Sequence, residues 1–270
     1  MTVLTMSDQA NVDSAPRPVP WRRMVWVTWR QHRTTLISVP AVLGALAVFL
    51  LIAGLKIHHD YSVLTACHPF GSNACQSLNT KFNSTDWTLG DSVLIFMNLG
   101  PAVIGAFAGA PVLARELETG TYRYAWTQGF GRERWTVAKI VLLAATVTVA
   151  TAAFGEMFAW FFQPFLKQES LAVTSSSVFT TRPLAYAAWT LVAFAIGTLA
   201  GMFIRRIVPA MATTLAVYAG LRIASWLPQG TSYIPVSRFW PMQFIEGGSL
   251  LVLSVGFIAA TVWLVRRRAA

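Results

Sequence analysis

Residues 115–139, RELETGTYRYAWTQGFGRERWTVAK, decide how this chain folds. They hold three of the eleven acidic residues and five of the twenty-one basic residues, and an apolar run of membrane-spanning length lies on each side of them. A highly charged loop between two such runs must lie in water at the membrane surface, because hydrocarbon solvates neither charges nor unpaired backbone groups. Five cations favour the cytoplasmic side. We therefore predict that a soluble partner moves the membrane part through this loop.

The composition is that of a membrane protein. Of 270 residues, 55% are hydrophobic and 12% are charged, whereas soluble domains have about 25% charged residues. The net charge of +10 would suit nucleic acid, but the cations cluster at the ends of apolar runs, which is a topology signal. No nucleic-acid partner is expected. Residues 1–20 hold acids and prolines in place of an apolar signal segment, so we expect a disordered cytoplasmic tail.

The rest of the chain, residues 21–270, is expected to form one all-α transmembrane domain. Residues 21–33 (WRRMVWVTWRQHR) place all four of their arginines on one helical arc and most of their apolar residues on the other, as in a helix lying in the membrane interface. Trp26 is the exception and lies among the arginines. Six apolar runs can each cross about 30 Å of hydrocarbon. They cover residues 35–55, 91–114, 137–163, 183–204, 207–227 and 249–265.

The distribution of cations orients these spans. With the amino terminus inside, fifteen of the twenty-one Lys and Arg residues lie on the cytoplasmic side. Both termini are therefore expected in the cytoplasm. The pairs Gly105/Gly109 and Gly197/Gly201, each with three residues between its members, allow close helix approach in the second and fourth spans.

The outer segments are expected to be loops. Residues 56–90 hold Cys67 and Cys75, with seven residues between them, and a disulfide is the first interpretation in an oxidising compartment. Two free thiols are an alternative. A metal site from His58, His59, His68, Asp60 and a thiolate is another, although the spacing fits no ligand pattern. Residues 164–182 form a second outer loop, and residues 228–248 are too rich in proline and glycine to be a span.

A few polar residues fall inside the spans. Glu156 in the third span is a functional candidate, because a carboxylate is costly there. The alternative is a structural partner for Arg222 or Arg182, and we expect Glu156 and Arg222 to pair. Asn98 in the second span and Tyr218 in the fifth are, with Glu156, the candidates for a substrate path.

Motifs for chemistry within the chain itself are absent. No G-x-x-x-x-G-K-[ST] sequence occurs, so a P-loop cannot hydrolyse nucleotide here. There is also no H-E-x-x-H, G-x-S-x-G or C-x-x-C-H. We expect no catalytic residues, no metal and no cofactor bound by this chain.

The order of elements and three sequence stretches resemble a known family. RELETGTYRYAWTQ (115–128), WRQHR (29–33) and RFWPMQFIE (238–246) are similar to permease subunits of ATP-binding-cassette exporters of the second membrane-domain type, in particular to actinobacterial members. In that family an acidic residue ends the second span, a Gly-Thr pair and a hydrophobic helical patch follow, and a basic residue opens the third span. Many relatives have a proline after the patch, where this chain has Gly129-Phe130-Gly131.

The resemblance implies a cytoplasmic coupling helix that an ATPase contacts. It places this role on Arg115, Glu116, Glu118, Gly120, Thr121, Arg123, Tyr124, Trp126, Thr127, Arg132 and Arg134, with Lys139 opening the third span. It further implies separate ATPase subunits that carry ATP and Mg, and a second permease copy, identical or different. The expected function is export of an amphipathic or lipid-like substrate, such as a drug, antibiotic or peptide-like molecule, from the plasma membrane by alternating access.

Two rival functions remain open at this point. The first is a non-transporting membrane sensor or scaffold that recruits a cytoplasmic partner through the loop 115–139. The second is a polytopic membrane enzyme that acts on lipids, with Glu156 or the pair His58/His59 as the acid–base group. Dependence on a partner ATPase distinguishes the exporter from both.

Overall fold

The computed structural model describes residues 20–69, 71–121, 132–168, 176–227 and 239–267, and in these ranges the chain forms helices and no strand. The elements are α1 (Trp21–Ala66), α2 (Asn73–Lys81), η1 (Phe82–Asp86), α3 (Trp87–Ile104), η2 (Gly105–Gly109), α4 (Pro111–Thr119), α6 (Arg132–Phe161), α7 (Gln163–Gln168), α8 (Ser176–Thr180), α9 (Pro183–Ile204), α10 (Ile207–Trp226) and α11 (Phe239–Arg267). Six helical runs are long and apolar enough to cross a membrane. The all-α polytopic prediction is confirmed.

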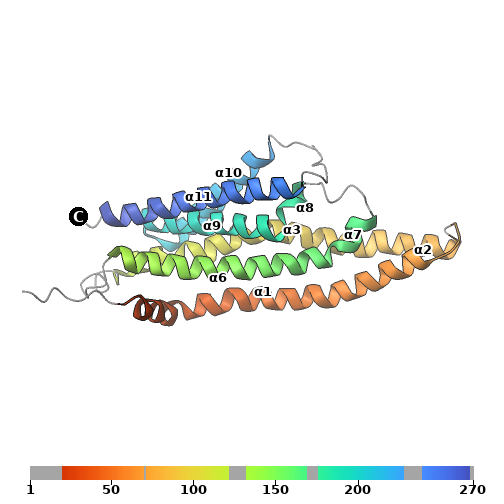
Figure 1. Cartoon of the computed structure of the whole chain (residues 1–270), viewed down its shortest axis with the longest axis horizontal. Helices are drawn as coiled ribbons and strands as arrows, with labels where there is room; N and C mark the ends of the chain where they lie inside the picture. The colour runs from red at the N-terminus through yellow and green to blue at the C-terminus, as the bar shows by residue number, and fades with distance from the viewer. Residues whose placement is uncertain (1–19, 70, 122–131, 169–175, 228–238, 268–270) are drawn as a thin grey trace, which may run out of the picture.

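The long helices lie side by side along one axis (Figure 1). The first turn of α1 and the last turn of α11 lie at the same end of the bundle, as an even number of crossings requires. We call the end that holds Trp21 and Arg267 the proximal end, and the end that holds α2, α7 and α8 the distal end. The expected tail, residues 1–20, lies outside the described residues except for Pro20.

Helix α1 corrects the predicted boundaries. The expected interfacial helix 21–33, the span 35–55 and the start of the expected loop 56–90 form one helix of 46 residues. At 1.5 Å per residue it is about 70 Å long, roughly twice the thickness of the hydrocarbon. Its buried face packs along α6. The helix therefore continues past residue 55, where we expected the edge of the membrane, and ends at Ala66.

The rest of the expected loop 56–90 is also mostly helical. Helices α1 and α2 form a hairpin at the distal end, and a disulfide joins Cys67 to Cys75 across it. Nζ of Lys56 lies 3.2 Å from Asp86 and 3.7 Å from Asp60. His58 stacks on Trp160, with ring centroids 4.6 Å apart. His58, Asp60 and both cysteines, which the metal alternative would use, therefore have other partners here.

Helix α9 is the centre of the bundle, and it meets η2 at glycines. A Cβ added to Gly197 would lie 2.5 Å from the carbonyl oxygen of Gly105, and a Cβ added to Gly105 would lie 2.6 Å from Ala193. Real Cβ atoms do not approach backbone that closely, so both positions need glycine. The two predicted small-residue pairs, Gly105/Gly109 and Gly197/Gly201, thus pack against each other.

The last span also begins earlier than expected. Residues 239–248, which we expected to belong to a broken segment, form the first turns of α11. Pro241 lies in the first turn, where a helix does not need its backbone N–H as a donor. The other part of the expected segment, residues 228–238, lies outside the described residues.

Candidate functional site

A buried ion pair joins the proximal ends of the second and third spans. Lys139 on α6 has no exposed side-chain surface, and its ammonium pairs with the carboxylate of Glu116 on α4. The same ammonium lies 3.1 Å from the centre of the Trp135 ring. A cation this deeply buried requires such partners, because removal from water is costly. Glu116 is therefore partly buried and held by Lys139, and its contact with an ATPase stays a prediction.

A second contact at the proximal end joins the second span to the fifth. The carboxylate of Glu118, on the last turn of α4, accepts a hydrogen bond of 3.0 Å from the backbone N–H of Ile207, the first residue of α10. The first N–H groups of a helix have no partner within it, and the helix dipole favours an anion there. Glu118 thus caps α10 across the two-residue turn formed by Arg205 and Arg206.

The third and sixth spans are also linked at this end. Nη2 of Arg266 on α11 lies 2.6 Å from Oε2 of Glu133, in the first turn of α6. Both side chains are largely exposed, so this pair contributes at most about 1 kcal/mol to stability. Of these three contacts, the pair of Glu116 with Lys139 is the most deeply buried.

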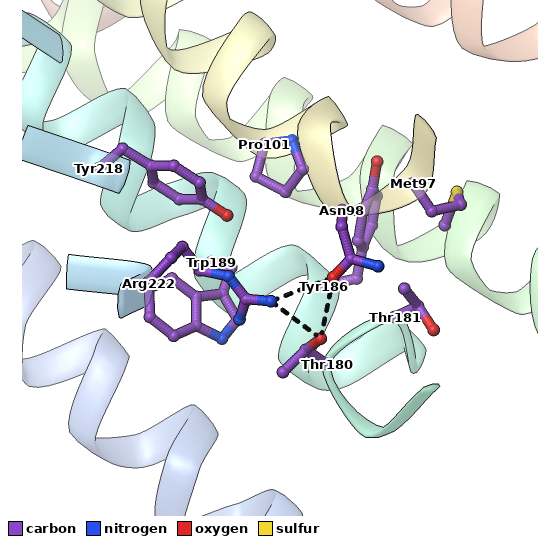
Figure 2. Close-up of a pocket in the computed structure, with 9 residues that line it drawn as sticks. All are labelled: Met97, Asn98, Pro101, Thr180, Thr181, Tyr186, Trp189, Tyr218 and Arg222. Atoms are coloured by element: carbon purple, nitrogen blue, oxygen red, sulfur yellow. Dashed lines mark hydrogen bonds between the residues drawn. The ribbon is translucent and has the colours of Figure 1, made fainter. Parts of the chain in front are cut away.

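The distal half of the bundle holds a polar network around Arg222 (Figure 2). Nη2 of Arg222 on α10 donates to Oδ1 of Asn98 on α3 at 3.0 Å and to Oγ1 of Thr180 on α8 at 3.3 Å. Its guanidinium carbon lies 4.8 Å from the centre of the Trp189 ring on α9. Nε1 of Trp189 donates to Glu246 on α11 at 2.8 Å. One network thus connects five helices.

This network borders a small cavity of about 10 Å³, which is about the space that one water needs. Its lining comes from α3, α8, α9, α10 and the turn after α8: Met97, Asn98, Pro101, Thr180, Thr181, Tyr186, Trp189, Tyr218 and Arg222. The cavity is far smaller than the 300 Å³ or so of an ordinary ligand site. This cavity is therefore too small to hold an amphipathic molecule.

A family profile described as "ABC-2 membrane transporter related" matches residues 40–227, well over half of the chain. The chain belongs to this family. No curated protein and no solved structure matches it significantly. Membership in the ABC-2 membrane transporter related family indicates the transmembrane subunit of an ABC transporter, and it implies an ABC ATPase partner. The matched residues include Glu116, Glu118, Lys139 and Arg222.

In this ABC-2 related chain, part of the predicted coupling set falls within the described residues. Gly120 ends α4 with a φ of 71°, a left-handed conformation that favours glycine. The hydroxyl oxygen of Thr121 lies 3.1 Å from that of Thr119. Arg115 and Arg134 are exposed. Arg132 is the first residue of α6. The predicted residues Arg123, Tyr124, Trp126 and Thr127 lie outside the described residues.

The three substrate-path candidates of this ABC-2 related chain do not lie together. Asn98 and Tyr218 line the cavity in Figure 2, but Glu156 does not. The predicted pair of Glu156 with Arg222 is wrong, because the hydrogen bonds of Arg222 go to Asn98 and Thr180. Burial lowers the pKa of Arg182, and the charge of Glu156 opposes that shift. Glu156 is therefore linked electrostatically to Arg182, the other partner that we considered.

Three members of the distal network were missed by sequence reasoning. Thr180 and Glu246 fall in segments that we expected to be outer loops, and Trp189 was counted only as an apolar residue of its span. One signal could have found Glu246. An acid three residues before the predicted start of the last span, on a segment rich in aromatic side chains, indicates a partially buried carboxylate that needs a partner.

Proposed function

We propose that this chain is the transmembrane subunit of an exporter that moves an amphipathic or lipid-like substrate outward by alternating access. Two permease copies face each other around the path, and separate ATPase subunits bind ATP and Mg. The proximal end faces the cytoplasm, and the protein resides in the plasma membrane with both termini inside. Family membership and the positive charge of the proximal end support this orientation.

The hydrogen bond between Glu118 and Ile207 carries the proposal. The charged stretch that begins at Arg115 is where a cytoplasmic partner can push, and α4 is its first element. Glu116 connects α4 to α6, and Glu118 connects α4 to α10. A displacement of α4 by the ATPase therefore moves the second, third and fifth spans together.

The network around Arg222 provides the opposing contact at the distal end. It joins α3, which is part of the second span, and α10, which is the fifth span, to α8, α9 and α11. Such a network resists separation, since a buried polar group without its partner costs about 1–3 kcal/mol. In the proposed cycle, movement of α4 and α10 separates Arg222 from Asn98 and opens the distal side.

The test is ATP-driven transport in inside-out vesicles that contain the chain and its cognate ATPase. Accumulation of a fluorescent lipid-like probe that depends on ATP hydrolysis supports export. Glu118→Arg places a cation at the N-terminus of α10 and should abolish transport while membrane insertion continues. Asp91→Arg is the control for the charge reversal and should leave transport unchanged, because Asp91 is exposed on α3 and lies outside the stretch 115–139.

Three outcomes contradict the proposal. Normal transport by Glu118→Arg would show that this contact does not couple the spans. An ATPase that binds and is stimulated without movement of any probe would favour the sensor or scaffold function. Conversion of a lipid by the chain alone, without ATP, would favour the membrane enzyme.

A further inference from the structure

An open apolar groove of about 420 Å³ lies between α9, α10 and α11 in the proximal half of the bundle. Its floor follows one stripe of α9, and α10 and α11 supply the sides: Ile196, Leu199, Ala200, Phe203, Ile204, Thr213, Val217, Phe257 and Leu264. Thr213 is the one polar residue of this lining, and its hydroxyl donates to the carbonyl oxygen of Pro209 within α10. The groove thus offers a ligand apolar contact alone.

The length of the groove indicates what fills it. From Ile196 to Ile204 the stripe rises about 12 Å along α9, which is less than half of the roughly 30 Å of hydrocarbon. The acyl chain of a lipid in one leaflet needs a groove only as deep as that leaflet. The dimensions therefore fit a lipid chain that enters from the proximal side.

Cations lie at the proximal mouth of the groove. Arg205 follows Ile204 directly, and both Arg205 and Arg206 are exposed. On the opposite side, Arg267 lies three residues beyond Leu264, with its guanidinium carbon 4.2 Å from the centre of the Trp263 ring. An apolar slot that ends in exposed arginines matches a molecule with a hydrocarbon chain and an anionic phosphate.

The backbone of Arg205 is a second, independent observation. Its φ is 61°, and within the described residues it is the one residue other than glycine with a positive φ. Helices commonly end in this left-handed conformation, but with glycine, because a Cβ is disfavoured there. Arg205 thus keeps an exposed cation at a position where glycine would adopt the same conformation at lower cost.

We propose that this groove binds an anionic phospholipid, with one acyl chain along α9 and the phosphate on Arg205 and Arg206. The groove lies next to the turn that Glu118 spans, because Arg205 and Arg206 immediately precede Ile207. A bound lipid would therefore hold the turn whose movement transport requires. Lipid binding itself does not depend on the proposed export function.

Native mass spectrometry of the intact detergent-purified chain tests the proposal. The probes are phosphatidylglycerol and phosphatidylcholine with identical palmitoyl and oleoyl chains. We expect tighter binding of phosphatidylglycerol, and Arg205→Gly should weaken it about fivefold, the contribution of one arginine near an anionic surface. This variant also relieves the disfavoured backbone, so its melting temperature should equal or exceed that of the wild type. Arg206→Gln provides a second charge variant.

The controls separate the groove from general charge and from folding. Arg33→Gln removes an exposed cation of α1, which contributes nothing to the groove, and should leave the lipid preference unchanged. Val217→Trp fills the groove and should weaken both lipids, whereas Val208→Trp adds the same bulk to α10 outside the lining, at a position 75% exposed.

Three results overturn the proposal. The first is equal retention of phosphatidylglycerol and phosphatidylcholine by the wild type. The second is an unchanged preference for phosphatidylglycerol in Arg205→Gly. The third is a Val217→Trp variant that no longer shows the mass of a dimer but still retains lipid. The last would assign the groove to a second copy.

Discussion

The carboxylate of Glu118 accepts a hydrogen bond of 3.0 Å from the backbone N–H of Ile207, 89 residues later in the chain. The end of the second span thus caps the beginning of the fifth. The contact crosses the proximal end of α9, which ends at Ile204. This acidic side chain adds a polar contact to the apolar packing between α4 and α10, and the proposed coupling depends on it.

Glu118→Ala removes this cap. We expect a loss of about 1 kcal/mol of stability, typical for the loss of a helix N-cap. The fraction of the wild-type transport rate that is lost should exceed the fraction of the free energy of unfolding that is lost. Glu118→Gln keeps an acceptor without the charge and should lie between the wild type and Glu118→Ala. Thermal unfolding in detergent and vesicle transport, measured in parallel, check this. Equal effects of the alanine and glutamine variants on transport would contradict a capping role.

Lys139→Met leaves the Glu116 carboxylate buried without its cation. Breaking a buried pair from one side costs about 3–5 kcal/mol, so we expect a severe loss of folded protein. The double variant Glu116→Leu with Lys139→Met should recover most of this loss, because it removes both charges together. Denaturant-induced unfolding of the two single variants and the double variant measures the coupling. Additive losses would mean that the pair is not formed.

Gly197→Ala places a Cβ 2.5 Å from the carbonyl oxygen of Gly105. Because α9 and η2 would have to separate, we expect a destabilisation of about 1–3 kcal/mol, as in an overpacked core. Gly220→Ala is the matched control, since a Cβ there has no atom within 4 Å. It should be neutral or slightly stabilising, owing to the helix propensity of alanine. Similar melting temperatures for the two variants would contradict the close packing.

Arg222→Met removes the donor that Asn98 and Thr180 share, and it should loosen the distal end. The readout is the rate at which a thiol reagent modifies a cysteine introduced as Thr181→Cys, a position that is 1% exposed. We expect labelling in the Arg222→Met background to be at least about fivefold faster, the factor that corresponds to 1 kcal/mol of lost interaction. Lys81→Met, which removes a cation of the distal hairpin, should leave the rate unchanged. No acceleration would mean that the network does not hold this end closed.

Hydropathy and charge were sufficient to predict the spans. The fourth span, predicted as residues 183–204, matches α9 because Pro183 suits the first turn and Arg205 follows the last. The glycine pairs also predicted a close contact, because small residues are required where helix backbones meet.

The boundaries of α1 and α11 could not be predicted in the same way. Hydropathy reports contact with lipid, whereas a helix continues as long as its backbone hydrogen bonds do. The polar residues 56–66 therefore extend α1 to Ala66, and α11 begins ten residues before its predicted span. The partners of Arg222 could not be predicted either. Thr180 lies 42 positions and Asn98 lies 124 positions from it, and only the packing of α9 against its neighbours brings them together.

Pro40 gives α1 a point at which it can bend, because a proline inside a helix removes one backbone hydrogen bond. From Pro40 to Ala66 the helix is about 40 Å long, so a tilt of 10° about Pro40 moves its distal tip by roughly 7 Å. The Cys67–Cys75 bridge closes the hairpin at that tip. A small change of angle at Pro40 would thus be magnified at the hairpin, where an attached probe could follow each turnover of the proposed cycle.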